Sequence, residues 1–485
     1  MNAPLRRLAV VVALLFASLL LSTSWIQYVG ASSVAAGQGN VRQVYREFGR
    51  ERGPIVTSDG QPVALSTEVG GDYQYLRQYP GGQVYAHATG FFSIVYGRTA
   101  IESVQNDVLA GTADSLFYSR IGQVLTGQDP AGGSVELTLD PVVQQAAWDA
   151  LGEQRGAVVA IEPSTGRILA LVSRPSFDPG SLASHDLGAV QEAWAALNAD
   201  PDRPLENRAV AGRTYPPGSV FKIVTAAAAI EEGGLTPESQ LPGPAELALP
   251  QTTATLPNVF GGPCGPGDLT TLADALRISC NTAFGQLGID LGGDVLREQA
   301  EDFGFGTELT IPLRTAESTV PEGMDPPQSA QAAIGQFDVR VTPLQVAMVS
   351  AAVANDGVLM RPQLVRTVRG PDLQVVEDVQ PEQLGRAVEQ STAEALTSMM
   401  VGVVEDGSGT AAQIDGVTVA GKTGTAQTGN ETDPHAWFTS FAPADDPRVA
   451  VAVVVENGGS AGSEASGGRV AAPVARAVMQ AVLDR

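Results

Sequence analysis

An apolar segment near the amino terminus constrains this chain more than any other feature. Arg6 and Arg7 precede it, and no charged residue occurs from Leu8 to Gln38. About 20 apolar residues suffice to cross a bilayer as a helix. Because positively charged flanks stay on the cytoplasmic side, the sequence predicts a cytoplasmic tail over residues 1–7 and a membrane anchor over residues 8–29. Everything downstream would then lie outside the cytoplasm.

Two features bear on whether this segment stays attached. Trp25 and Tyr28 are aromatic residues of the kind that gather at membrane interfaces, which favours an uncleaved anchor. The small residues from Ala31 to Ala36 are typical of a cleavage site, which favours a removable signal peptide. Both interpretations place the bulk of the chain outside the cell membrane. We expect the anchored form, a single-pass membrane protein.

Composition excludes several classes of protein. The 485 residues carry a formal net charge of −24, and 44% of them are hydrophobic. The acidity leaves no overall basic footprint for nucleic acid, and the hydrophobic share is that of a folded globular chain. The few cysteines and histidines do not have the spacing of a zinc site. We therefore expect no nucleic-acid partner, no metal and no cofactor.

The sequence beyond the anchor divides into two regions. Residues 30–155 begin with a short polar linker over 30–39 and continue with short strand-like runs between glycines, so we expect an N-terminal pedestal or interaction domain. Residues 156–485 mix hairpin strands with apolar helices. This mixture predicts an α/β protein of the α+β type, with an antiparallel sheet flanked by helices. The clearest elements are helices over 141–151, 220–232, 344–354 and 470–483, a hairpin over 157–161 and 167–172, and a strand over 449–455.

The strongest chemical signal is the sequence Tyr215-Pro-Pro-Gly-Ser-Val-Phe-Lys222. Gly218 allows a tight turn, so we expect Ser219 at the start of the helix that follows. Residues three apart share a helix face, which lets the Lys222 amine reach the Ser219 hydroxyl. A serine becomes an effective nucleophile when a neighbouring base accepts its proton, and a buried lysine can be that base. Alone, the pattern also fits a serine that merely caps a helix.

Two weaker signals follow along the chain. Ser279-Cys280-Asn281 places a hydroxyl that can relay a proton two residues before an amide that can hold a peptide group. Lys422-Thr423-Gly424-Thr425 is typical of a strand, and Gly424 lets a substrate backbone approach closely. Lys422 supplies positive charge, and the threonine hydroxyls suit a carboxylate. Each signal alone also fits a plain turn or an edge strand.

The three motifs become specific when they are taken together. SxxK, SxN and KTG occur in this order, a combination that resembles the penicillin-recognising serine acyltransferases. Further resemblance to penicillin-binding transpeptidase domains covers residues 156–170, 207–209 and 334–345. Residues 40–42 and 52–55 are similar to the pedestal of class B penicillin-binding proteins. On these motifs the chain is identified as a class B penicillin-binding protein, similar to the short actinobacterial members.

The resemblance implies a serine D-Ala-D-Ala transpeptidase of peptidoglycan. Ser219 would attack the carbonyl between the last two D-alanines of a stem peptide, and Lys222 would take its proton. Ser279, near Lys422, would pass a proton to the departing D-alanine, and Asn281 would bind the donor backbone. An amine from a neighbouring stem peptide would then resolve the acyl-enzyme.

The resemblance also implies how the third motif and inhibitors act. Thr423, Gly424 and Thr425 would bind substrate, and the oxyanion would lie between the N–H groups of Ser219 and Thr425. β-Lactams would acylate Ser219 by mimicking the D-Ala-D-Ala bond.

The family's usual partners follow in the same way. The substrates would be stem peptides on glycan strands derived from lipid II, used in cell division or cell shape. Glycan polymerisation would come from a membrane glycosyltransferase of the shape, elongation, division and sporulation group. The region between the anchor and residue 156 is too short for a glycosyltransferase domain.

The two cysteines leave two interpretations open. In an exported chain Cys264 and Cys280 can form a disulfide that braces the second motif. The alternative is two free thiols, one of them buried as a small apolar residue.

Other functions share the three motifs. A D,D-carboxypeptidase differs only in letting water attack the acyl-enzyme, and a penicillin-binding sensor or scaffold is acylated without turnover. A class A β-lactamase would add an acidic deacylation base, and no Glu-x-x-Leu-Asn pattern occurs between Asn281 and Lys422. The class B-like N-terminal region favours transpeptidation.

Overall fold

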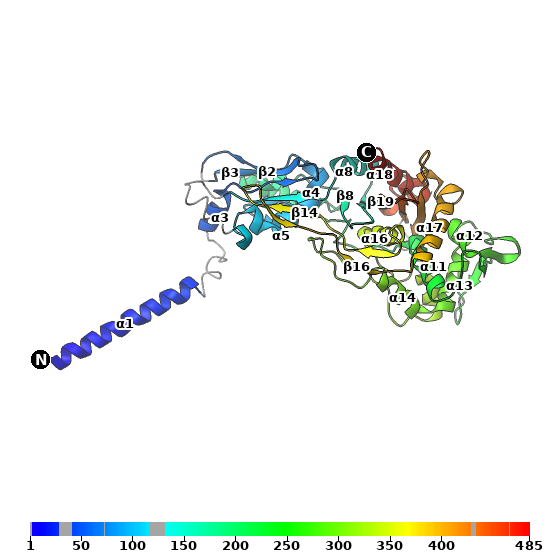
Figure 1. Cartoon of the computed structure of the whole chain (residues 1–485), viewed down its shortest axis with the longest axis horizontal. Coiled ribbons are helices and arrows are strands. Elements are labelled where there is room, and N and C mark those ends of the chain that lie inside the picture. Colours follow the sequence, from blue (N-terminus) through cyan, green and yellow to red (C-terminus); the bar gives the residue numbers. More distant parts are fainter. Residues whose placement is uncertain (1, 29–40, 72, 117–130, 428–432, 465) are drawn as a thin grey trace.

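The computed structural model describes residues 2–28, 41–71, 73–116, 131–427, 433–464 and 466–485. Helix α1 (Asn2–Tyr28) stands apart from the folded body (Figure 1). It is long and apolar enough to cross a membrane, and its apolar part is not buried against the rest of the chain. The linker expected over residues 30–39 lies outside the described residues.

The main sheet of the larger region has five strands in the order β17–β18–β19–β7–β8, and all its pairs are antiparallel. The strands are β7 (Gly156–Ile161), β8 (Ile168–Arg174), β17 (Ala420–Ala426), β18 (His435–Ala442) and β19 (Val449–Val455). Helix α16 (Pro343–Ala354) covers one face, while α8 (Pro141–Leu151) and α18 (Ala472–Leu483) cover the other. Since both faces are buried, β19 is apolar along its whole length. The expected antiparallel sheet flanked by helices is confirmed.

A second sheet of six strands forms the part nearest the anchor, in the order β15–β14–β6–β1–β2–β3 (Figure 1). The strands are β1 (Ile55–Val56), β2 (Pro62–Glu68), β3 (Tyr75–Gln78), β6 (Ser134–Leu137), β14 (Val365–Arg369) and β15 (Val375–Asp378). Beside this sheet lie α3 (Val41–Phe48), α4 (Gly82–Thr89), α5 (Ala100–Val104) and α6 (Asn106–Leu109). The carboxylate of Glu102 in α5 is buried and pairs with Arg52 and Arg77 over 2.6 Å each.

The structure does not divide into two separate bodies at the boundary expected after residue 155. Helix α8 precedes it in sequence but packs on the five-stranded sheet, whereas β14 and β15 follow it and extend the six-stranded sheet. β14 pairs with β6 in antiparallel register, with Val368 opposite Val135. The two regions are joined by shared secondary structure as well as by the chain.

The remaining elements are mostly short. The helices are α9 (Gly180–Ala183), α10 (Leu187–Ala199), α11 (Lys222–Glu231), α12 (Leu272–Arg277), α13 (Asn281–Leu291), α14 (Gly293–Asp302), α15 (Pro326–Ala332) and α17 (Gln390–Glu405). The paired short strands are β4 (Phe92–Ser93) with β5 (Gly97–Arg98), β9 (Gln240–Pro242) with β12 (Leu269–Thr271), β10 (Glu246–Ala248) with β11 (Thr255–Pro257), and β13 (Val358–Met360) with β16 (Gln383–Arg386).

Two of the expected helices begin differently in the structure. The segment expected as one helix over 220–232 starts with a 3₁₀ turn, η2 (Gly218–Phe221), and becomes α-helical at Lys222. The closing helix α18 begins at Ala472, after a single π turn at Gly467–Ala471. In both places a glycine packs against the backbone of the β17–β18 hairpin, which sets the path of the chain into the helix.

Candidate active site

The nucleophile motif lies tightly against the edge strand β17. Gly218 has a φ of 55°, and a Cβ atom there would lie 2.7 Å from the carbonyl oxygen of Thr425. A Cβ atom on Gly424 would lie 3.1 Å from the carbonyl oxygen of Pro217. Two glycines thus let η2 and β17 touch. That Gly424 also admits a substrate backbone stays a prediction.

Ser219 is half-buried within η2, one turn before Lys222. In a 3₁₀ turn residues three apart are eclipsed, so the two side chains leave the same face. The expected shared face is present, although the turn is 3₁₀ and not α-helical. Within the described residues the Lys222 amine hydrogen-bonds to the second motif and not to Ser219.

The Lys222 amine is fully buried and surrounded by oxygen atoms. It donates to the carbonyl oxygen of Ser279 over 2.8 Å, to Oδ1 of Asn281 over 2.8 Å and to Oγ of Ser279 over 3.3 Å. Burial, together with the neighbouring charge of Lys422, holds the pKa of Lys222 well below its ordinary value. This shift favours the neutral form of the amine, which is the form that can accept a proton.

Lys422 approaches the same hydroxyl from the other side of the site. Its Nζ donates to Oγ of Ser279 over 2.9 Å and to the carbonyl oxygen of Thr423 over 3.0 Å. Burial lowers the pKa of Lys422 to about 7. The Ser279 hydroxyl can accept from both amines and still donate its own proton. It therefore links the two lysines, which are the only ones in the chain.

The local backbone holds Ser279 and Asn281 in place. Ser279 lies between α12 and α13 with a φ of 62°, an unusual conformation for a residue with a side chain. Asn281 begins α13, and the side chain of Asn258 accepts hydrogen bonds from the N–H groups of Asn281 and Thr282 over 2.9 and 3.1 Å. Asn258 was not predicted from the sequence, since its only local signal is a Pro-Asn turn.

The two cysteines form a disulfide beside this segment. Cys264 and Cys280 have Cα atoms 5.9 Å apart and are separated by 16 residues in the sequence. Cys280 is the middle residue of the second motif, so the bond ties that motif to the loop that carries Cys264.

The third motif lies on the free edge of the five-stranded sheet. Thr425 is partly exposed there, whereas the hydroxyl of Thr423 shares a 2.6 Å hydrogen bond with Ser408 in the loop after α17. Ser408 was also missed by the sequence analysis, because a serine between two glycines is typical of any turn. The two lysine amines are buried, whereas four other residues of the three motifs are partly exposed: Ser219, Ser279, Asn281 and Thr425.

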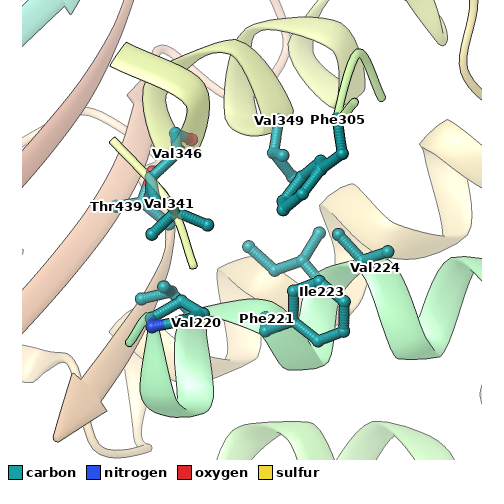
Figure 2. Close-up of a pocket in the computed structure, with 10 residues that line it drawn as sticks. Val220, Phe221, Ile223, Val224, Phe305, Val341, Val346, Val349 and Thr439 are labelled. Carbon is teal, nitrogen blue, oxygen red and sulfur yellow. Dashed lines mark hydrogen bonds between the residues drawn. The ribbon is translucent and has the colours of Figure 1, made fainter. Parts of the chain in front are cut away.

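A small apolar cavity lies behind the nucleophile and is distinct from this site. Figure 2 shows it between η2 and α11 on one side and Val346 and Val349 of α16 on the other. Apart from Thr439, the side chains around it are apolar. It is a packing void of the core and offers no groups that would recognise a peptide.

Two protein-family models match the part of the chain that follows the anchor. A model of the penicillin-binding protein transpeptidase domain matches residues 156–480, and a model of the penicillin-binding protein A dimerisation domain matches residues 52–135. The chain belongs to the penicillin-binding transpeptidases. This family relation confirms the class expected from the three motifs, a serine-type D-Ala-D-Ala transpeptidase.

Two mycobacterial relatives match this transpeptidase over its full length. The chain is 47% identical to the peptidoglycan D,D-transpeptidase PbpA of Mycolicibacterium smegmatis, over 100% of this chain and 99% of that protein. It is 46% identical to PbpA of Mycobacterium tuberculosis, again over 100% of this chain and 99% of the relative. The similarity to short actinobacterial class B proteins is confirmed.

Solved structures give the same result for the fold. The ceftriaxone acyl-enzyme complex of penicillin-binding protein A from M. tuberculosis matches this transpeptidase with a TM-score of 0.88 and 46% identity, over 90% of this chain and 100% of that one. The penicillin G acyl-enzyme complex of the same protein matches with a TM-score of 0.85 and 46% identity, with the same coverage.

Proposed function

We propose that this transpeptidase cross-links peptidoglycan stem peptides through an acyl-enzyme on Ser219. One observation carries the proposal: a buried lysine amine lies one turn from Ser219 and contacts the Ser279 hydroxyl, which in turn accepts from Lys422. A nucleophile, a base of lowered pKa and a proton relay therefore adjoin one another.

The first half-reaction forms the acyl-enzyme. Oγ of Ser219 attacks the carbonyl carbon between the two terminal D-alanines, and its proton passes to the neutral amine of Lys222. The oxyanion lies between the backbone N–H groups of Ser219 and Thr425. The C–N bond then breaks, and the departing D-alanine amine receives a proton through the hydroxyl of Ser279.

The second half-reaction forms the cross-link. An amine of a neighbouring stem peptide attacks the ester carbon, and its proton passes to the same base. The bond to Oγ of Ser219 then breaks as the base returns a proton to Oγ. Asn281 binds the donor backbone. The substrate carboxylate lies beside Lys422, Thr423, Gly424 and Thr425, where Lys422 attracts it when protonated.

β-Lactams undergo only the first half-reaction, the acylation of Ser219. The four-membered amide presents its carbonyl to Ser219 as the D-Ala-D-Ala bond does, and the acyl-enzyme persists when no acceptor amine displaces it. One relative, penicillin-binding protein A of M. tuberculosis, was crystallised as acyl-enzyme complexes with ceftriaxone and penicillin G, which supports this step.

Labelling by a fluorescent penicillin tests the nucleophile. Ser219→Ala should abolish covalent labelling, and digestion of labelled wild-type protein should place the adduct on Ser219. The matched control is Ser103→Ala, which removes an exposed hydroxyl of α5 and should label normally. Retained labelling of Ser219→Ala would contradict the proposal.

Hydrolysis by a D,D-carboxypeptidase and acylation without turnover are the competing outcomes. With a stem-peptide donor and an excess of an acceptor amine, the transpeptidase yields the cross-linked product. A carboxypeptidase yields mainly the trimmed peptide and free D-alanine, and a sensor or scaffold yields neither beyond one equivalent.

The anchor and the N-terminal region suggest where the reaction occurs. We propose that α1 is a single membrane anchor, that residues 30–155 form a pedestal or interaction domain, and that residues 156–485 act outside the cytoplasm. A membrane glycosyltransferase of the shape, elongation, division and sporulation group would supply glycan strands. Protease protection in sealed vesicles tests the topology, and cross-linking from residues 30–155 tests the partner.

A further inference from the structure

A buried carboxylate lies behind the nucleophile turn and takes no part in the reaction above. Glu456 directly follows β19 and is 2% exposed. Its Oε1 accepts hydrogen bonds from the Tyr215 hydroxyl over 2.7 Å and from Nε of Arg208 over 2.9 Å. Its Oε2 lies 2.7 Å from Nε of Arg155. One carboxylate thus joins segments that are far apart in the sequence.

Tyr215 connects this carboxylate to the nucleophile. It lies four residues before Ser219, and its backbone exchanges two hydrogen bonds with Val341, of 2.9 and 2.8 Å. Its ring packs edge-on against Trp437, with the centroids 6.0 Å apart. The indole N–H of Trp437 donates to the carbonyl oxygen of Pro216 over 3.1 Å. The position of Tyr215 therefore fixes where the turn that carries Ser219 begins.

The same cluster contacts the far end of the β17–β18 hairpin. His435 begins β18 opposite Ala426, the last residue of β17. Its ring lies edge-on to Tyr215 at 5.5 Å, and its Nδ1 accepts from the N–H of Asn457 over 3.0 Å. The nucleophile turn and the strand of the third motif are thus held against one support.

The charges in the cluster keep this support ionised. Burial opposes ionisation of Glu456, but the hydrogen bond from Tyr215 and the neighbouring arginines outweigh it and hold the pKa of this carboxyl below its ordinary value. The two hydrogen bonds to Oε1 of Glu456, from Tyr215 and Arg208, are charge-assisted and therefore strong. The Tyr215 hydroxyl therefore meets a rigid acceptor.

We infer that Glu456 is a positioning residue, which holds Ser219 in line for acylation through the hydroxyl of Tyr215. The inference rests on the proposed role of Ser219. Glu456 does not touch the reacting groups, so its loss should slow the acylation step and leave the initial binding of a β-lactam unchanged. Small misplacements of a reacting atom cost up to about a hundredfold in rate.

A second cluster of the same composition provides a matched control. In the N-terminal region the hydroxyl of Tyr79 donates over 3.1 Å to Oε1 of Glu102. That buried carboxylate also pairs with two arginines, Arg52 and Arg77. Tyr79→Phe and Tyr215→Phe therefore remove the same kind of hydrogen bond from the same kind of environment, one remote from the active site and one beside it.

The test measures acylation by a fluorescent penicillin over a range of concentrations, so that the first-order rate constant separates from the dissociation constant of the initial complex. Tyr215→Phe should lower the rate constant by about tenfold and leave the dissociation constant unchanged. Tyr79→Phe should change neither quantity, even where both variants lose similar thermal stability. Glu456→Gln should lower the acylation rate constant at least as much as Tyr215→Phe does. The double variant should be only slightly slower than Glu456→Gln alone.

Other results would overturn the inference without touching the nucleophile. Equal acylation rate constants in Tyr215→Phe and wild type, with the adduct still on Ser219, would leave Glu456 a structural residue only. Glu456 would also be purely structural if Tyr79→Phe slowed acylation as much as Tyr215→Phe does. If Glu456→Gln fails to fold, the milder variant Tyr215→Phe still tests the inference. An adduct on another residue in the wild type would instead contradict the proposed function.

Discussion

The amine of Lys222 donates a hydrogen bond of 2.8 Å to Oδ1 of Asn281. The acceptor is a neutral amide, which leaves the amine free to lose its proton. Replacing that amide with a carboxylate would favour the protonated amine, because an opposite charge at this distance raises a lysine pKa by about 1–3 units. The neutral amide of Asn281 therefore helps to keep the amine of Lys222 unprotonated, which is the form that can accept a proton.

Asn281→Asp tests this relation through pH. A protonated Lys222 cannot accept the Ser219 proton, so acylation falls as the pH falls through the pKa of Lys222. Raising that pKa moves the acid limb of the rate profile to higher pH. On that limb we expect acylation to be slower by about tenfold or more, with recovery at higher pH. Asn281→Ala removes the contact without adding charge, so it should not move the limb upward. The prediction would be wrong if the acid limb of the rate profile in Asn281→Asp lay at the same pH as in the wild type.

Lys222→Ala should slow acylation of Ser219 by a penicillin about 10²–10⁴-fold, the usual contribution of a general base. The fold should survive, because the fully buried Lys222 amine costs desolvation energy that the alanine does not. Stopped-flow measurement of acylation, with circular dichroism as the check on folding, decides the point. An unchanged rate in a folded variant would remove Lys222 from the role of base.

Ser408→Ala should lower the acylation efficiency by about fivefold. Ser408 shares a 2.6 Å hydrogen bond with the hydroxyl of Thr423, and such a bond contributes about 1 kcal/mol. Without it the Thr423 hydroxyl is free to rotate away from a substrate carboxylate. Ser408→Thr keeps the hydroxyl and should retain most of the efficiency. Equal losses in both variants would show that the hydrogen bond is not what matters.

Removal of the disulfide should destabilise the protein and the second motif together. The bond closes a separation of 16 residues, for which the chain-entropy model gives about 3 kcal/mol. Cys264→Ser/Cys280→Ser should show this loss in urea denaturation, and reduced wild type should behave similarly. Peptide mapping without reduction should recover a Cys264–Cys280 pair. Alkylation of both native thiols in untreated protein would exclude the bond.

Local chemistry made several elements predictable. Helix α8 begins at Pro141 because Asp140 accepts hydrogen bonds from the N–H groups of Val142 and Val143, a cap that the local sequence predicts. Strand β19 was predicted over its full length, since an uninterrupted apolar run of that length is typical of a strand buried on both faces.

Contacts between distant segments could not be predicted in this way. The Tyr215 hydroxyl and Glu456 are 241 positions apart, and nothing near either residue marks the pairing. The same holds for Ser408 and Thr423, and for the meeting of β14 with β6. The motifs identified the reacting groups, but only the fold identifies the residues that hold those groups in place.

The scarcity of lysine has a practical consequence. The whole chain contains Lys222 and Lys422 and no other lysine, and both are buried and donate to the Ser279 hydroxyl. A sample enriched with ¹³C only at lysine Cε would give two side-chain resonances in an NMR spectrum, without any assignment problem from the rest of the molecule. Titration of those two signals would read the protonation of the reaction centre directly, before and after an antibiotic is bound.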